Sequence, residues 1–274
     1  MTLTIDKQTI LKYDIAGPRY TSYPTAPVWS EEVTESVYIQ KLKQFGATNK
    51  TLSLYIHLPF CETMCTYCAC NVIIRKPDEK YADEYLEHLF KEIDLVAAHM
   101  GRNNIVKQFH WGGGTPTFLT EAQIEKLFNK VAARFQIDLN GEIAVEIGPR
   151  TVDRQKIKKL KNLGFNRISM GVQDFDERVQ RAVNRLQPYE LVKEYYDICR
   201  ELNFHSVNLD LIYGLPFQTQ NTFQKTVEKV IQLKPDRIAL YSFAYVPWLK
   251  KHQKKIDQAA FPTSDTKLET IRDA

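Results

Sequence analysis

Four of the five cysteines in this 274-residue chain lie between Cys61 and Cys70. Three of them have the spacing Cys61-x3-Cys65-x2-Cys68, so one short segment can present three thiolates together. Disulfide frameworks spread cysteines along secreted chains, whereas the polar opening MTLTIDKQT lacks the apolar stretch of a signal peptide. The cysteines therefore predict a metal centre in a reducing compartment, and we expect the chain to be cytoplasmic.

Two kinds of metal centre use clustered thiolates. A cubane iron–sulfur cluster takes one ligand for each iron, so three cysteines leave one iron open to a small chelating ligand. Tetrahedral zinc is the alternative, although structural zinc commonly uses two separated pairs and the chain has no second CxxC or HxxxH pair. The spacing favours the cluster. Cys70 cannot then be a required fourth ligand, and both a role toward the substrate or radical and simple packing remain open for it.

The elements that must position these residues alternate between short apolar runs and longer amphipathic segments. Six runs read as strands, at 52–58, 105–111, 143–147, 167–172, 207–213 and 237–243. Helical spacing falls at 81–100, 121–135, 152–163, 177–183, 189–202 and 221–233. This repetition predicts an α/β fold with parallel strands, and six units are too few to close an eight-stranded barrel. We therefore expect a partial (β/α)6 TIM-like barrel.

The segments outside the repeat define the expected domain organisation. Residues 1–50 read as an N-terminal arm or lid, residues 51–247 as the barrel, and residues 248–274 as a polar helix that begins a truncated C-terminal region. No apolar run is long enough to span a bilayer, and a net charge of +4 is too small to argue for nucleic acid. The basic clusters at 156–161 and 250–255 read as solvated helix faces.

Polar residues or glycines follow nearly every predicted strand, at the rim where (β/α) barrels assemble their active sites. They are Cys61, Gly112 to Gly114, Glu146, Gln173, Asp210 with Gly214, and the turn at 244–247. Asp210 interrupts an apolar strand and must have a partner there, with a structural salt bridge as one option. Tyr55 and His57 alternate along the first strand and so share one face, where His57 reads as a packed, hydrogen-bonded core residue.

The cysteine motif directly after the first strand, with Tyr67 before its last cysteine, resembles the radical S-adenosylmethionine superfamily. Further segments resemble one family within it, the oxygen-independent coproporphyrinogen III oxidases: GPRYTSYPTA, YIHLPFCETMCTYCACN, HWGGGTPTFL, RISMGVQDF, VNRLQ and NLDLIYGLPFQT. The resemblance runs from about residue 10 to about residue 247. It implies a [4Fe–4S] cluster whose open iron binds S-adenosylmethionine, and electron transfer that cleaves the sulfonium to a 5′-deoxyadenosyl radical.

The resemblance also implies residue roles. Cluster ligands would be Cys61, Cys65 and Cys68, and contacts to S-adenosylmethionine would come from Tyr55, Gly113, Gly114, Thr115 and Glu146. A second S-adenosylmethionine would be held by Gln173, Arg185 and Asp210, with Tyr67 and Ala244 beside it. The chain departs from the family at Gly148, where Glu-x-Asp-Pro-Arg is common.

The implied reaction is oxidative decarboxylation of two propionates of coproporphyrinogen III to vinyl groups, giving protoporphyrinogen IX in haem biosynthesis. Arg19 is a speculative partner for substrate carboxylates, the electron donor and acceptor are unidentified, and we expect a monomer. The family continues into a C-terminal domain that is apparently absent here. The alternatives are a haem chaperone of the same superfamily, against which Cys70 and the N-terminal arm argue, and another porphyrin-modifying radical enzyme.

Overall fold

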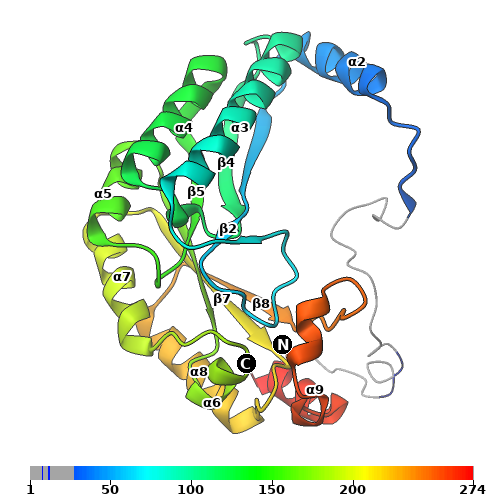
Figure 1. The fold of residues 1–274 in the computed structure, drawn as a ribbon. Helices are drawn as coiled ribbons and strands as arrows, with labels where there is room; N and C mark the ends of the chain where they lie inside the picture. Colours follow the sequence, from blue (N-terminus) through cyan, green and yellow to red (C-terminus); the bar gives the residue numbers. More distant parts are fainter. Residues whose placement is uncertain (1–7, 9–11, 13–27, 274) are drawn as a thin grey trace.

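A curved sheet of six parallel strands forms the centre of the computed structural model, which describes residues 8, 12 and 28–273. The strands follow chain order across the sheet: β1 (Leu52–Leu58), β4 (Ile105–Gly113), β5 (Gln136–Ile147), β6 (Arg167–Gln173), β7 (Ser206–Tyr213) and β8 (Arg237–Ser242). Within the described residues β1 and β8 are the two edges, so the sheet does not close on itself (Figure 1). The predicted partial barrel is confirmed, and the predicted GPRYTSYPTA arm with Arg19 lies outside the described residues.

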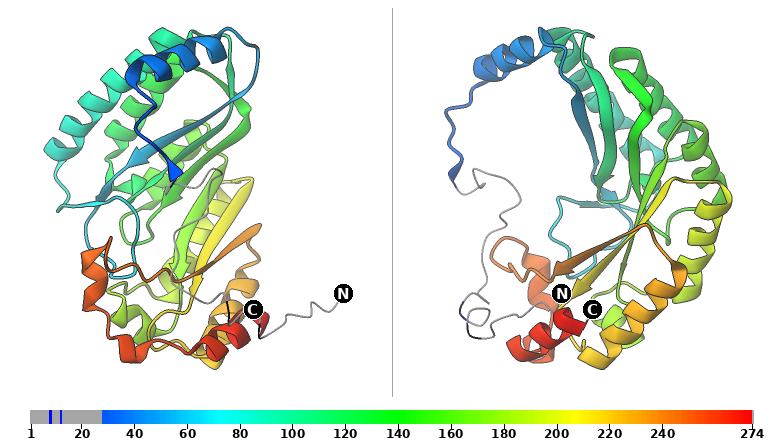
Figure 2. Two further views of the ribbon diagram at one scale, coloured as in Figure 1. Left: turned by 90° about the vertical axis from the view of Figure 1, so that its right-hand side faces the viewer. Right: turned by 180° about the vertical axis from the view of Figure 1, so that it is seen from behind.

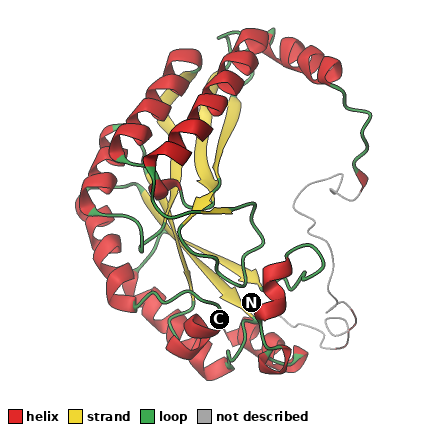
Figure 3. Ribbon diagram, in the orientation of Figure 1, coloured by secondary structure: helices red, strands yellow, loops and turns green. Residues whose placement is uncertain are grey.

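Helices cover the convex face of this sheet in an arc (Figure 3). They are α3 (Glu79–Met100), α4 (Glu121–Arg134), α5 (Arg154–Asn162), α6 (Glu177–Ala182), α7 (Tyr189–Glu201) and α8 (Gln220–Leu233). Helix α4 begins with a capping box, in which the Thr120 hydroxyl accepts from the Gln123 amide and the Gln123 side chain accepts from the Thr120 amide. This reciprocal capping satisfies two amides that a helix start would leave unpaired.

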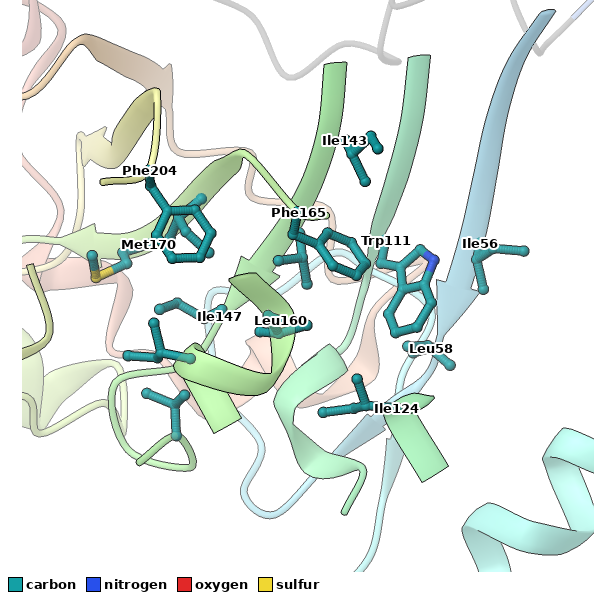
Figure 4. Packing of buried hydrophobic residues seen from close by; sticks show 14 of the residues in the cluster. Ile56, Leu58, Trp111, Ile124, Ile143, Ile147, Leu160, Phe165, Met170 and Phe204 are labelled. Atoms are coloured by element: carbon teal, nitrogen blue, oxygen red, sulfur yellow. The ribbon is translucent and has the colours of Figure 1, made fainter. Parts of the chain in front are cut away.

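The core lies between the sheet and these helices. Trp111 of β4 has no exposed surface and packs edge-on against Phe165, with ring centroids 5.0 Å apart. Figure 4 shows both rings beside Ile143 and Leu160 in the buried cluster. Because strand side chains alternate between faces, the apolar residues of each strand point into this core and their neighbours point to the concave side.

Helix α2 (Glu35–Gly46) packs against α3 at the end of the sheet where the strands begin (Figure 1). A side chain on Gly46 would meet the Met100 carbonyl, so glycine allows this close contact. The Asn104 amide donates to the Lys50 carbonyl at 2.7 Å and fixes the entry into β1. Helix α2, which belongs to the predicted arm, thus lies at the opposite end of the sheet from Cys61.

The segment after β8 differs from its prediction as one polar helix. It forms two short 3-10 helices, η3 (Lys251–Lys255) and η4 (Gln258–Ala260), before α9 (Ser264–Asp273). Gln253 and Ile256 are buried, and their contacts hold the chain in an irregular path that helical periodicity does not reveal. No described helix has the length and apolar content needed to cross a membrane.

Candidate functional site

A cavity of about 600 Å³ opens at the edge of the sheet where the strands end. It is lined by the cysteine loop, meaning residues 61–71, and by the ends of the central strands. Thirteen predicted site residues meet there: Cys61, Cys65, Tyr67, Cys68, Cys70, Gly113, Gly114, Thr115, Glu146, Gln173, Arg185, Asp210 and Ala244. Tyr55 lines a second cavity on the concave face, and Glu146, Ser169, Asp210 and Tyr241 line both.

The cysteine loop is closed at its base by a short pairing of β2 (Phe60–Cys61) with β3 (Ile73–Ile74). All five cysteines of the chain are free thiols. The described residues include no trio of His, Cys, Asp or Glu side chains grouped tightly enough for one metal ion. A cubane places its irons at separate corners, and three thiols around one cavity fit that wider ligand set.

Two arginines approach the central thiol of the loop. Arg150 Nη2 lies 3.5 Å from Cys65 Sγ, and Arg185 Nη1 lies 3.7 Å from the same atom. Positive charge at this distance favours the net negative charge of a thiolate-bound cluster. Arg150 was not predicted from the sequence as a site residue. Arg150 follows the end of the strand that carries Glu146, and this position could have suggested that it lies at the rim.

Two thiols of the motif, those of Cys61 and Cys68, hold their protons more tightly in the metal-free chain than a free cysteine does. Burial raises the pKa of the Cys61 thiol, and a hydrogen bond from Thr115 offsets part of that effect. The hydrogen bond with Cys70, followed by burial, raises the pKa of the Cys68 thiol above its usual range. Since metals bind thiolates, binding of a metal cluster at this site releases protons and is therefore stronger at higher pH.

Close packing within the chain leaves no room for a side chain at Gly112, Gly113 or Gly114. A side chain on Gly113, whose φ is +119°, would lie 2.8 Å from the His57 ring. One on Gly114 would lie 2.6 Å from the Pro59 carbonyl oxygen, and one on Gly112 would lie 2.8 Å from a carboxylate oxygen of Glu146. The close approach is therefore to the chain itself. Contact of these glycines with a ligand stays a prediction.

A row of polar side chains crosses the concave face from β1 to β5. Tyr55 and His57 share a face as predicted, with 3.0 Å between the Tyr55 hydroxyl and His57 Nδ1. His57 Nε2 donates to the Asn71 carbonyl at 2.8 Å, so His57 is hydrogen-bonded but only partly buried. The Tyr55 ring stacks on His110, which lies 3.2 Å from Glu146 Oε1. Burial, with the Glu146 charge adding to it, raises the pKa of Tyr55 to about 12.

Within the described part of the chain Asp210 has no ion-pair partner, so the structural salt bridge considered from the sequence is not found there. Its partners are neutral: Asn208 Nδ2 donates at 2.6 Å and the Ser169 hydroxyl at 3.2 Å. Burial, opposed by the Asn208 hydrogen bond and reinforced by Glu146, raises the pKa of Asp210 from 3.8 to about 6. The carboxylate thus keeps its charge available to a ligand in the cavity.

Gln173 and Arg185 present a matched pair of unsatisfied atoms. Arg185 Nη2 donates to the Gly171 carbonyl at 2.8 Å, but Arg185 Nε is buried and has no partner among the residues that the structure describes. Gln173 Oε1 is also buried without a partner, on a residue whose φ is +68°. An unmet buried donor or acceptor costs about 1–3 kcal/mol, so this pair indicates a ligand with its own acceptor and donor. The carboxylate and ammonium of an amino acid, such as the methionyl part of S-adenosylmethionine, fit it.

The basic clusters at 156–161 and 250–255 were predicted to be solvated, but Lys156 and Lys250 bind backbone carbonyls instead. Lys156 is partly buried, and its ammonium donates to the Thr117 carbonyl at 2.8 Å and the Thr151 carbonyl at 3.3 Å. Lys250 donates to the Cys70 carbonyl at 3.0 Å. Both tie loops of the rim together. No local pattern distinguishes them from neighbouring lysines, because their partners are distant in the sequence.

Comparison with known proteins gives a family match. Residues 55–230 match the model of the radical SAM superfamily. The chain is 46% identical over 272 residues to the oxygen-independent coproporphyrinogen III oxidase of Synechocystis sp. and 42% identical over 273 residues to that of Pseudomonas aeruginosa. Each alignment covers 99% of this chain, but 58% and 59% of those relatives.

A solved structure gives the same relationship. The coproporphyrinogen III oxidase of Escherichia coli, described as a radical SAM enzyme, superposes with a TM-score of 0.91 at 39% identity. The match covers 99% of this chain and 60% of that one, so the chain spans less than two thirds of these relatives. The chain belongs to the radical SAM superfamily, whose cofactors are a [4Fe–4S] cluster and S-adenosylmethionine.

Proposed function

We propose that this chain carries the cofactor-binding site of an oxygen-independent coproporphyrinogen III oxidase. The reaction converts two propionates of coproporphyrinogen III to vinyl groups and yields protoporphyrinogen IX for haem biosynthesis. The observation that carries the proposal is one cavity lined both by three free thiols and by the unsatisfied Gln173 and Arg185 pair. Similarity to the named oxidases along 99% of the chain supports it.

The cysteine side of the cavity would hold the metal cluster. Cys61, Cys65 and Cys68 supply the thiolates, and Arg150 and Arg185 favour the negative charge that accumulates there. When bound, the cluster supplies the electron that cleaves S-adenosylmethionine to methionine and a carbon radical able to remove a hydrogen atom. The chemistry belongs to the cofactors, while the chain orients them and shields them from water.

Two S-adenosylmethionine positions are proposed along the rim. The first lies near Gly113, Gly114, Thr115 and Glu146, with Tyr55 below, where the Glu146 carboxylate accepts hydrogen bonds from hydroxyl or ammonium groups. The second lies against the matched pair, where Arg185 donates to a carboxylate and Gln173 accepts from an ammonium.

The remaining residues of the second position have distinct tasks. Asp210 adds a carboxylate that is ionised at neutral pH, because its pKa is about 6. Tyr67 and Ala244 line the wall beside it. Together these groups would fix the polar end of the cofactor.

For each propionate, removal of a hydrogen atom from the carbon β to the carboxylate is followed by loss of carbon dioxide and of one electron, which leaves the vinyl group. The electron passes to an acceptor that is unidentified, as is the donor that reduces the cluster. Free thiols of this kind persist in a reducing compartment, and we propose a cytoplasmic monomer.

The test is anaerobic reconstitution of the chain with iron and sulfide, beside a Cys61→Ala, Cys65→Ala, Cys68→Ala triple variant. We expect the parent chain alone to gain absorbance near about 400 nm and to cleave S-adenosylmethionine reductively. Absence of both from the parent chain would contradict the proposal. Coproporphyrinogen III is then supplied and vinyl products are measured. Stoichiometric haem binding without decarboxylation would assign the chain to the haem chaperones instead.

A further inference from the structure

The chain turns back across the cysteine loop after β8, as the orange segment beside the cyan loop shows (Figure 2). Three side chains of residues 244–256 donate to successive parts of that loop. Gln253 Nε2 binds the Tyr67 carbonyl at 3.0 Å, His252 Nε2 the Cys68 carbonyl at 2.7 Å, and Lys250 Nζ the Cys70 carbonyl at 3.0 Å. Each bond joins residues at least 180 positions apart, so only the folded chain creates this contact.

Gln253 is the centre of this contact. It has no exposed surface, and every polar atom of its side chain is used. Its Oε1 accepts from the Val246 amide at 2.6 Å, while its Nε2 donates to Ala244 as well as Tyr67, each at 3.0 Å. One buried amide thus joins the turn after β8 to the residue that precedes Cys68, and a satisfied buried polar group of this kind is rigid.

The two halves of the cysteine loop are held by different parts of the fold. The first half is fixed near α6, where the Thr66 amide donates to the Val183 carbonyl at 3.0 Å and Asn184 Nδ2 donates to the Met64 carbonyl at 2.8 Å. The second half, with Cys68, is fixed by His57 at Asn71 and by residues 244–256. Loss of the contacts with residues 244–256 would loosen Cys68 and leave Cys61 and Cys65 in place.

We propose that residues 244–256 act as a clasp that positions Cys68 and so slows the loss of the metal cluster. Groups that orient metal ligands commonly change metal affinity by about 10–100-fold when removed, and a cluster held by three thiolates is sensitive to each. Gln253, His252 and Lys250 are positioning residues, because they act through the loop backbone. This inference rests on the cluster that the proposed function requires.

The main experiment compares Gln253→Leu with the control Gln123→Leu. Gln123 is also buried and donates to the Glu79 carbonyl and to Asp83, contacts that involve neither the cysteine loop nor residues 244–256. Both variants should lower the melting temperature. Only Gln253→Leu should release the reconstituted cluster to an iron chelator about tenfold faster than the parent chain. Equal release rates for the two variants would overturn the proposal.

A second pair of variants removes no buried group. Lys250→Ala should speed cluster release by about threefold, whereas Lys254→Ala, at an exposed neighbouring position, should leave the rate unchanged. If neither Lys250→Ala nor Gln253→Leu changes the rate of cluster release, residues 244–256 do not hold the cluster and the proposal is wrong.

A metal-free readout separates this inference from the proposed function. Hydrogen exchange at the amides of residues 66–71 should be faster in metal-free Gln253→Leu than in metal-free Gln123→Leu, because the loop loses its outer support. Failure of the parent chain to assemble a cluster would count against the proposed function, while this exchange difference would still decide whether the clasp holds the loop. Equal exchange in the two variants would overturn the clasp.

Discussion

The same strands form both faces of the six-stranded sheet, but one face is apolar and buried while the other is polar and lines the cavities. Along β5 and β7, Val145 and Leu209 point toward the helices and are completely buried. Their immediate neighbours, Glu146 and Asp210, point to the concave side and line both cavities. Alternation along a strand therefore lets one segment stabilise the fold and bind ligands with adjacent residues.

The concave face differs from the interior of a closed barrel, which side chains fill. Tyr241 and Tyr55 on this face are 58% and 54% exposed, in contrast to Trp111 on the convex face at 0%. An open sheet of six strands leaves Tyr241 and Tyr55 in contact with water, although burial still raises the pKa of Tyr55 and of Asp210 on the same face. The open barrel is thus what makes the polar row available to ligands.

The largest expected difference between the two faces comes from truncating one aromatic side chain on each. Trp111→Ala should lower the free energy of unfolding of the metal-free chain by about 3–5 kcal/mol, since it leaves a cavity in the core. Tyr241→Ala on the concave face should lower it by less than about 1 kcal/mol. Urea denaturation measures both, and similar losses would mean that the concave face also carries the stability of the fold.

The next effect concerns binding at the rim. Arg185→Lys keeps the charge but removes the unsatisfied Nε donor, so S-adenosylmethionine should bind about 10–100-fold more weakly, as expected for a lost charged hydrogen bond. Calorimetric titration of the reconstituted chain measures the affinity. Arg181→Lys, at an exposed ion pair with Glu177 on nearby α6, is the matched control and should bind normally. Unchanged affinity in Arg185→Lys would place the ligand elsewhere.

A third prediction separates function from stability at one concave residue. The folded-state pKa of Asp210 is raised from 3.8 to about 6, so the native chain holds its proton more tightly than the unfolded chain. The stability that protonated Asp210 contributes is complete below the unfolded pKa and is lost as pH rises through about 6. Asp210→Asn should therefore raise the free energy of unfolding by about 2 kcal/mol at about pH 7.5, with little gain near pH 4.

Denaturation of the metal-free Asp210→Asn variant across this pH range measures the difference. The same substitution should weaken binding of S-adenosylmethionine, since it removes the charge that the cavity offers to a ligand. Stabilisation that is equal at both ends of the pH range would show that ionisation of Asp210 is not the cause.

The smallest effect is expected on the outermost surface of the convex side. Lys193 pairs with Asp197 one turn away on α7, with both side chains exposed to water. Lys193→Ala should leave the melting temperature within experimental error, because water screens exposed ion pairs. A clear fall in melting temperature would show that the outer polar layer, and not only the buried core, sets the stability of the convex side.

Much of the rim followed from the sequence because its residues stand at strand ends. Alternation and spacing predicted β1 at 52–58 with its observed bounds, and parallel order brings the ends of successive strands to one edge. Cys61, Glu146 and Asp210 therefore meet at one cavity as expected. The helix predicted after residue 247 was wrong, because burial of Gln253 and Ile256 outweighs the local preference for helix.

The sequence by itself determined the parallel sheet, its two chemically different faces and the three thiols on one loop, because each depends on local alternation or on covalent spacing. Only the tertiary structure decided which groups surround those thiols. Arg150 reaches Cys65 across 85 residues and Gln253 reaches Tyr67 across 186, and neither side chain carries a local signal of its destination. Such contacts exist because the folded sheet brings distant loops to one rim, where their charges and amides meet the cysteines.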